Sequence, residues 1–191
     1  MTDVFDVLSS DHDAVRQMLA ELEAGPAAAD GADDDQLRSR KKLADRLVME
    51  ESRHEAAEQM YVWPAVRDRV DDGGRLADHA LGQERDGERA LSQIDGHNAA
   101  DPEFEQAISE FITAARQHMQ FEETEVWPLL RAALTEKEIG LMTDQYQTAK
   151  QAAPTRPHPG KLESPEKLRT GGPMVAAMDR ARDALTRRGK D

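Results

Sequence analysis

The sequence predicts an all-α protein, an up-down-up-down four-helix bundle with a short fifth helix and a C-terminal tail. Aromatic residues make up only 4% of the chain and β-branched runs are absent, whereas Ala, Leu, Glu, Asp and Arg abound. In four consecutive segments, apolar residues recur at helical spacings of three, four or seven. Short polar connections containing glycine or proline separate these segments. Together, these observations are typical of a helical bundle.

The ends of the helices can be placed from their terminating residues. Gly25-Pro26 ends the first helix, and the second begins near Asp35. The third follows the acidic glycine turn at 71–74, and the fourth begins at Asp101-Pro102, an N-cap followed by proline. Thr135-Glu136-Lys137-Glu138 has the pattern of a capping box, which predicts a fifth helix that ends near Ala153.

Charge divides the chain into unequal parts. The net charge is −13, but residues 151–191 carry nine basic and five acidic side chains, so the basic excess is confined to the end of the chain. The prolines and glycine at 154–160 cannot continue a helix. We therefore expect a bundle at 1–133, an additional helix at 134–153, and a basic, partly helical or disordered tail at 154–191 that could bind a protein partner.

Composition excludes several classes of function. Without cysteine there are no disulfides, thiolate catalysis, Fe–S clusters or zinc fingers. A strongly acidic chain is a poor ligand for nucleic acid or an anionic membrane. The N-terminus lacks the features of a signal peptide, and no apolar run is long enough for a membrane span. We expect a cytoplasmic monomer whose partner is a small molecule, not a nucleic acid or a membrane.

An internal repeat is the most informative feature of the sequence. His54 and Glu58 form a His-x-x-x-Glu motif that recurs 64 residues later as His118 and Glu122. Val-Trp-Pro and then Arg follow both motifs at the same offsets. One helix earlier, each motif is preceded by an Asp-His pair, which contains His12 in the first case and His79 in the second.

This spacing has a chemical reason. Residues four apart lie on one face of a helix, so each motif presents an imidazole and a carboxylate together. Two such hairpins packed face to face would bring four imidazoles and two carboxylates to the centre of the bundle. A single histidine in such a place is more often an ordinary core residue. Six unpaired buried groups would cost several kcal/mol per charge, whereas metal binding removes that cost. The set suits Fe, Mn or Zn.

The arrangement resembles the hemerythrin-like (HHE cation-binding) family over residues 1 to about 133. The resemblance implies a non-haem centre of two Fe ions, bridged by oxo or hydroxo and by carboxylates. It also implies the binding, sensing or handling of O₂, NO or peroxide, with a link to oxidative stress. Carried over residue by residue, the implied ligands are His12, His54, Glu58, His79, His118 and Glu122, with the two glutamates as bridges.

The sequence departs from the oxygen-carrying members of that family at Gln83, where a second histidine is expected four residues after His79. Tyr61, seven residues after His54, is a candidate weak ligand or hydrogen-bond donor, although ordinary packing explains it equally well. Glu84 is a further possible donor, but five residues from His79 it is rotated off the expected face. The more open site leaves two functions, a binding or sensing protein and a di-iron oxidoreductase that decomposes peroxide or reduces NO.

Overall fold

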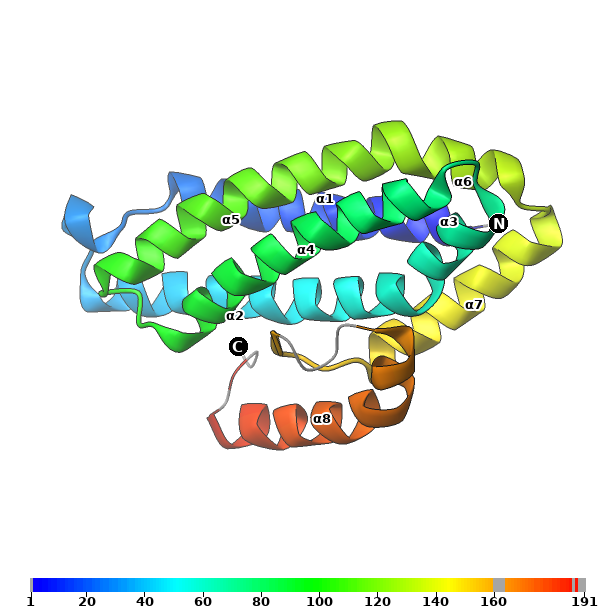
Figure 1. Ribbon diagram of the computed structural model, residues 1–191. Coiled ribbons are helices and arrows are strands. Elements are labelled where there is room, and N and C mark those ends of the chain that lie inside the picture. Colours follow the sequence, from blue (N-terminus) through cyan, green and yellow to red (C-terminus); the bar gives the residue numbers. More distant parts are fainter. Residues whose placement is uncertain (1, 160–163, 187, 189–191) are drawn as a thin grey trace.

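A computed structural model describes residues 2–159, 164–186 and 188. Within these residues every regular element is helical, which confirms the all-α prediction. Four long helices, each antiparallel to its neighbour in the chain, form the bundle (Figure 1): α1 (Val4–Ala24), α2 (Asp34–Ala57), α4 (Gly73–Gly96) and α5 (Pro102–Phe121). A short 3₁₀ turn at Ala28–Asp30 lies between α1 and α2.

Two of these helices continue through a π-helical turn. After α2 the turn Glu58–Val62 leads into α3 (Trp63–Arg69), and after α5 the turn Glu122–Val126 leads into α6 (Trp127–Ala133). The cause is a proline two residues after each turn, which has no N–H to continue the α-helical hydrogen bonds. The preceding tryptophan N–H instead reaches the carbonyl five residues back. The Trp-Pro repeat in the sequence is therefore the signature of two π turns.

Local signals explain most of the helix ends. Thr135 accepts a hydrogen bond from the N–H of Glu138, which confirms the predicted capping box at the start of α7 (Glu136–Ala152). The expected turn at 71–74 places Asp72 in the left-handed region, with φ of 58°. Its successor must be glycine, because a Cβ atom on Gly73 would lie 2.0 Å from the carbonyl oxygen of Val66.

Two large apolar clusters lie at opposite ends of the bundle, and a small third one joins α2 to the C-terminal segment. One joins the second half of α1, the middle of α2, the end of α4 and most of α5, around Leu19, Leu47 and Phe111. The other joins the start of α1 to α3, α6 and α7, around Trp63 and Leu130. In the α1 seam His12 lies between Leu8 of the second cluster and Val15 of the first. The predicted ligands therefore belong to the layer between the two clusters.

The chain beyond the bundle packs back on it. Helix α7 contacts α1 and α2, and α8 (Pro165–Thr186) lies along the side of the bundle formed by α2 (Figure 1). Helix α8 is continuous, although Pro173 lies inside it. Ion pairs join this region to the acidic bundle: Arg156 and Arg188 both contact Asp95, at 2.7 and 2.6 Å.

Candidate metal centre

Both His-x-x-x-Glu motifs lie where a long helix enters its π turn. His54 and His118 are in the last turns of α2 and α5, and Glu58 and Glu122 are the first residues of the π turns that follow. All four side chains are buried, and both glutamates have no exposed surface. Because each tryptophan N–H bonds to the carbonyl of the glutamate five residues earlier, the π turn fixes the backbone of both glutamates.

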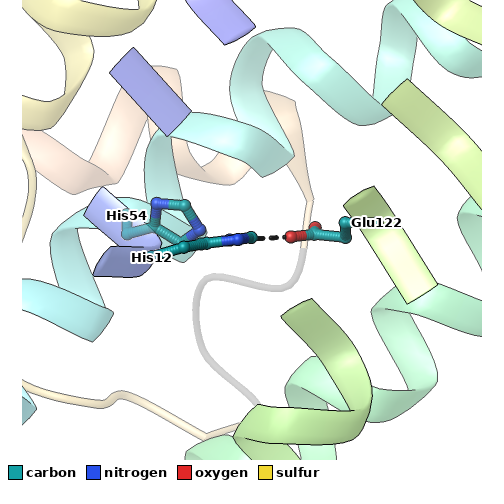
Figure 2. A group of neighbouring side chains, drawn as sticks. All are labelled: His12, His54 and Glu122. Atoms are coloured by element: carbon teal, nitrogen blue, oxygen red, sulfur yellow. Dashed lines mark ion pairs between the residues drawn. The ribbon is translucent and has the colours of Figure 1, made fainter. Parts of the chain in front are cut away.

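Three helical segments contribute to a first group of possible ligands. His12 of α1, His54 of α2 and Glu122 each offer one ligand atom, and these atoms lie within 4.8 Å of one another. Figure 2 shows the two imidazoles side by side, with the Glu122 carboxylate pointing at the edge of the His12 ring. The Nε2 atom of His12 lies 3.0 Å from Oε2 of Glu122.

A second group adjoins the first. It consists of Glu58, Glu84 of α4 and His118, whose ligand atoms also lie within 4.8 Å of one another. The second oxygen of Glu122 lies 3.2 Å from Nε2 of His118, and Oε2 of Glu58 lies 3.2 Å from Nε2 of His54. Each of these two glutamates therefore faces histidines of both groups, which is where a ligand shared by two ions would lie.

The inward-facing atoms of these residues lack hydrogen bonds. Among the described residues, Nε2 of all three histidines and both oxygens of Glu58 and of Glu122 have no hydrogen-bond partner, although they approach one another at 3.0 to 3.2 Å. Leaving buried polar atoms unsatisfied costs about 1 to 3 kcal/mol each. Metal ions would satisfy all of them, so these residues fit a group of cations.

Electrostatics in the protein without metal reflect the crowding of these groups. Burial, reinforced by the charge of Glu58, raises the pKa of Glu84 to about 8 and that of Glu122 well above its usual range. Burial also lowers the pKa of His12 and of His118 to about 4. Burial opposes protonation of His54 too, but the carboxylates of Glu58, Asp11 and Glu51 together outweigh it and raise the pKa of His54. Cations would remove this conflict by binding ionised carboxylates and neutral imidazoles.

The outward nitrogens of two histidines are held by polar side chains. The Nδ1 atom of His12 lies 2.8 Å from Glu123, which also forms an ion pair with Arg16. The Nδ1 atom of His118 lies 3.3 Å from the side-chain oxygen of Gln83. A hydrogen bond from Nδ1–H fixes the tautomer that leaves Nε2 free to bind a metal. Gln83, which occupies the place of the absent histidine, therefore supports a ligand in this structure.

A chain of hydrogen bonds supports the third histidine. The Tyr146 hydroxyl of α7 lies 2.8 Å from Nδ1 of His54 and donates to Asp11 at 2.9 Å. Lys150 completes the chain with a 2.7 Å ion pair to Asp11. Burial raises the pKa of Asp11, but the His54 hydrogen bond and Lys150 outweigh it and lower this pKa to about 2. Burial raises the pKa of Tyr146 above its usual value, so its hydroxyl keeps its proton.

Two donors orient Glu84 in the second group. Gln59 donates to one of its oxygens at 2.7 Å, and the indole N–H of Trp63 donates to the other. Both donors belong to the segment that carries Glu58, so the π turn positions Glu58 itself and the partners of Glu84.

The structure brings together five of the six residues expected as ligands, namely His12, His54, Glu58, His118 and Glu122, and leaves His79 apart. His79 is exposed, and its ring contacts the edge of Phe121. Its place is taken by Glu84, five residues later and about 140° around the helix. The sequence contains a signal for Glu84, because its position fits the helical spacing of the buried residues. Successive spacings of three and four residues connect positions 77, 80, 84, 87 and 91, and all five are buried.

Tyr61 follows His54 by seven residues and was expected on the same helical face. The structure places Tyr61 elsewhere. The intervening π turn has more residues per turn than an α-helix, so Tyr61 is rotated away from the two groups. Its half-buried ring lies beneath the guanidinium of Arg169, 5.7 Å away. The tyrosine that contacts a candidate ligand is Tyr146, on the fifth predicted helix, where periodicity alone gave no reason to look.

Comparison with known proteins agrees with this geometry. Residues 3–130 match the model of the hemerythrin HHE cation-binding domain. The chain belongs to the hemerythrin HHE cation-binding family. An uncharacterized hemerythrin-like protein of Schizosaccharomyces pombe is 24% identical over 141 residues, which are 73% of this chain and 70% of that protein. No solved structure matched the chain.

The matched region of the hemerythrin-like domain contains every residue of both ligand groups. It ends before α7, so Tyr146 lies outside it. Among the described residues, no helix is both long and apolar enough to cross a membrane.

Proposed function

We propose that this protein is a non-haem di-iron protein that handles or senses small oxidants or gases, namely O₂, NO or peroxide. One ion would be held by His12, His54 and Glu122, and the other by Glu58, Glu84 and His118. The observation that carries the proposal is the set of inward-facing ligand atoms without hydrogen bonds. Three imidazoles and three carboxylates suit iron, and manganese or zinc would also accept these ligand types.

Iron would supply reversible binding or redox chemistry, and the chain's own residues would control it. Glu58 and Glu122 would keep the two ions close, because each faces histidines of both groups. Trp127 stacks on His12, with ring centroids 4.8 Å apart, and keeps water from that side of the centre. Helix α7 covers His54 and supplies Tyr146 to it.

A second candidate function is a di-iron oxidoreductase that decomposes peroxide or reduces NO. The hydrogen-bond chain from His54 through Tyr146 to Asp11 and Lys150 favours it, because it joins the centre to the partly exposed Glu50. Hydrogen bonds in series can carry a proton between a buried site and solvent. The reduction of two NO molecules to N₂O and water takes up two protons and two electrons, the electrons from an external reductant, whereas reversible binding takes up none.

The proposal is tested by recording the absorption of iron-loaded protein before and after reduction, and again on adding O₂, NO or peroxide. We expect spectral changes with at least one of these molecules. A stable O₂ adduct would select the binding function, whereas rapid peroxide loss that His118→Ala abolishes would select the enzyme. An iron-loaded protein whose spectrum none of the three molecules changes would contradict both.

The remaining expectations about partners and location stay predictions. We propose a cytoplasmic monomer that binds neither nucleic acid nor membrane. A protein partner of the tail remains part of the proposal, because α8 leaves Met174, Met178 and Leu185 exposed. Sedimentation of the purified protein would test the oligomeric state.

A further inference from the structure

A cavity of about 90 Å³ lies between the bundle and the C-terminal segment. Its floor is formed by α2, the π turn after it and α4, and its roof by residues 154–158 together with Leu168 of α8. The residues that matter for its chemistry are polar: Ser52, Glu55, Gln59, Arg85, Arg156 and His158. The cavity is therefore shaped by the tail as much as by the bundle.

The roof is held in place by buried ion pairs. Arg156 contacts Asp95 of α4 and Asp183 of α8, both at 2.7 Å. His158 lies 2.9 Å from Asp179, and its backbone N–H donates to Glu88 at 3.0 Å. These contacts tie the segment to the bundle and to α8, so the roof has a defined position.

Two polar atoms of the cavity lining are unsatisfied. Ser52 is 7% exposed and its hydroxyl has no hydrogen-bond partner among the described residues. The same holds for Nε of Arg156, although the other guanidinium nitrogens are paired. A buried hydroxyl and a buried N–H in one cavity are suited to a small molecule that both donates and accepts hydrogen bonds.

The floor of this cavity adjoins the second ligand group. Gln59 lines the cavity and also donates to Glu84 at 2.7 Å. The Gln59 side chain therefore contacts both the cavity and a candidate metal ligand. Glu58, in the same ligand group, is the residue before Gln59. Gln59 is therefore where the cavity comes into contact with this ligand group.

We propose that this cavity admits and holds a small, uncharged, hydrogen-bonding oxidant, such as hydrogen peroxide, on its way to the second ligand group. A water molecule occupies about 30 Å³ of liquid, so the cavity has room for roughly three molecules of that size. Side chains of both signs line it, which favours a neutral molecule over an ion. The identity of the oxidant rests on the proposed function, but the route does not.

The test narrows the cavity with Ser52→Leu, which replaces the hydroxyl by a branched apolar side chain. Ser92→Leu is the matched control, because it makes the same change in a different surface pocket, on α4, that none of the candidate ligands lines. Arg85→Phe narrows the mouth from an exposed position and keeps the test valid if Ser52→Leu does not fold.

Two readouts are compared in these variants. The first is the rate of peroxide loss in iron-loaded protein. The second is quenching of Trp63 fluorescence by dissolved oxygen, measured in zinc-loaded protein that also carries Trp127→Phe. Zn²⁺ has no redox chemistry, so this readout reports passage alone. Trp63 is a suitable reporter because it is 1% exposed and donates to Glu84 behind Gln59.

We expect Ser52→Leu and Arg85→Phe to lose most of the oxygen quenching and of the peroxide rate, while Ser92→Leu matches the parent protein in both. Quenching and peroxide loss that are equal in all variants would overturn the proposed route. If the parent protein consumes no peroxide but Ser52→Leu still loses the quenching, the route is supported and peroxide decomposition is refuted.

Discussion

The two tyrosines of the chain allow a matched test of the structure around His54. Tyr146→Phe removes one hydroxyl, which lies 2.8 Å from Nδ1 of His54 and donates to Asp11. Asp11 keeps its 2.7 Å ion pair with Lys150, so the substitution leaves no carboxylate unpaired. The loss therefore falls mainly on the orientation and basicity of His54.

Removing a partner of a metal-binding histidine typically lowers metal affinity about 10- to 100-fold. For Tyr146→Phe this corresponds to about 1.4 to 2.7 kcal/mol in binding free energy. The metal-free protein loses one buried hydrogen bond, about 1 kcal/mol of unfolding free energy. Tyr61→Phe is the control, because Tyr61 contacts Arg169 and belongs to neither ligand group. Its effect on affinity is expected to be negligible.

The assay is competition for iron with a chelator of known affinity, together with thermal unfolding of metal-loaded and metal-free protein. Reduced affinity in Tyr146→Phe alone would support the assignment of Tyr146 as the partner of His54. Unchanged affinity in Tyr146→Phe, or an equal loss in Tyr61→Phe, would refute it.

Three further predictions concern the ligand groups. His118→Ala should lose the ion of the second group, whereas His79→Ala should retain both ions, because His79 is exposed and belongs to neither group. Metal analysis of the two purified variants tests this. Trp63→Phe removes a donor to Glu84 and should weaken metal binding about tenfold in chelator competition. Without metal, the raised pKa of Glu84, about 8 against an ordinary 4.5, means that the folded chain holds its proton to higher pH than the unfolded chain. The raised pKa of His54 acts in the same direction. The lowered pKa values of His12 and His118 act in the opposite direction, but only below about pH 6.5. The unfolding free energy of metal-free protein should therefore fall between about pH 6.5 and 8. Glu84→Gln should reduce that fall, and a flat pH profile in the metal-free parent would contradict the assignment.

Much of the fold followed from local signals. Helical spacing located the four long helices, and Thr135 marked the start of the fifth, because both signals depend on residues close in the chain. The π turns were harder to predict. A proline in the sequence indicates that one helical hydrogen bond is missing, but it does not indicate whether the backbone kinks, ends the helix or forms a π turn. That response turned Tyr61 away from His54, and a strict α-helical period could not foresee it.

The candidate site was predictable to the extent that it repeats. His54 and Glu58, with their counterparts 64 residues later, were found because the motif is duplicated. Glu84 of α4 was named only as a secondary candidate, because the match between His12 and His79 pointed to a symmetry that the structure does not keep. Tyr146 reaches the centre only through the packing of α7 on α1 and α2, a tertiary contact with no local signature.

The central claim is that two adjacent ligand groups bind two iron ions. The most direct measurement is an anaerobic titration of metal-free protein with Fe²⁺, in which bound iron per folded chain is counted at saturation. The structure predicts two ions per chain, one for each group. In Glu84→Ala, which removes a ligand from the second group alone, we expect one. Saturation of the parent protein below two, or an unchanged count in Glu84→Ala, would contradict the account.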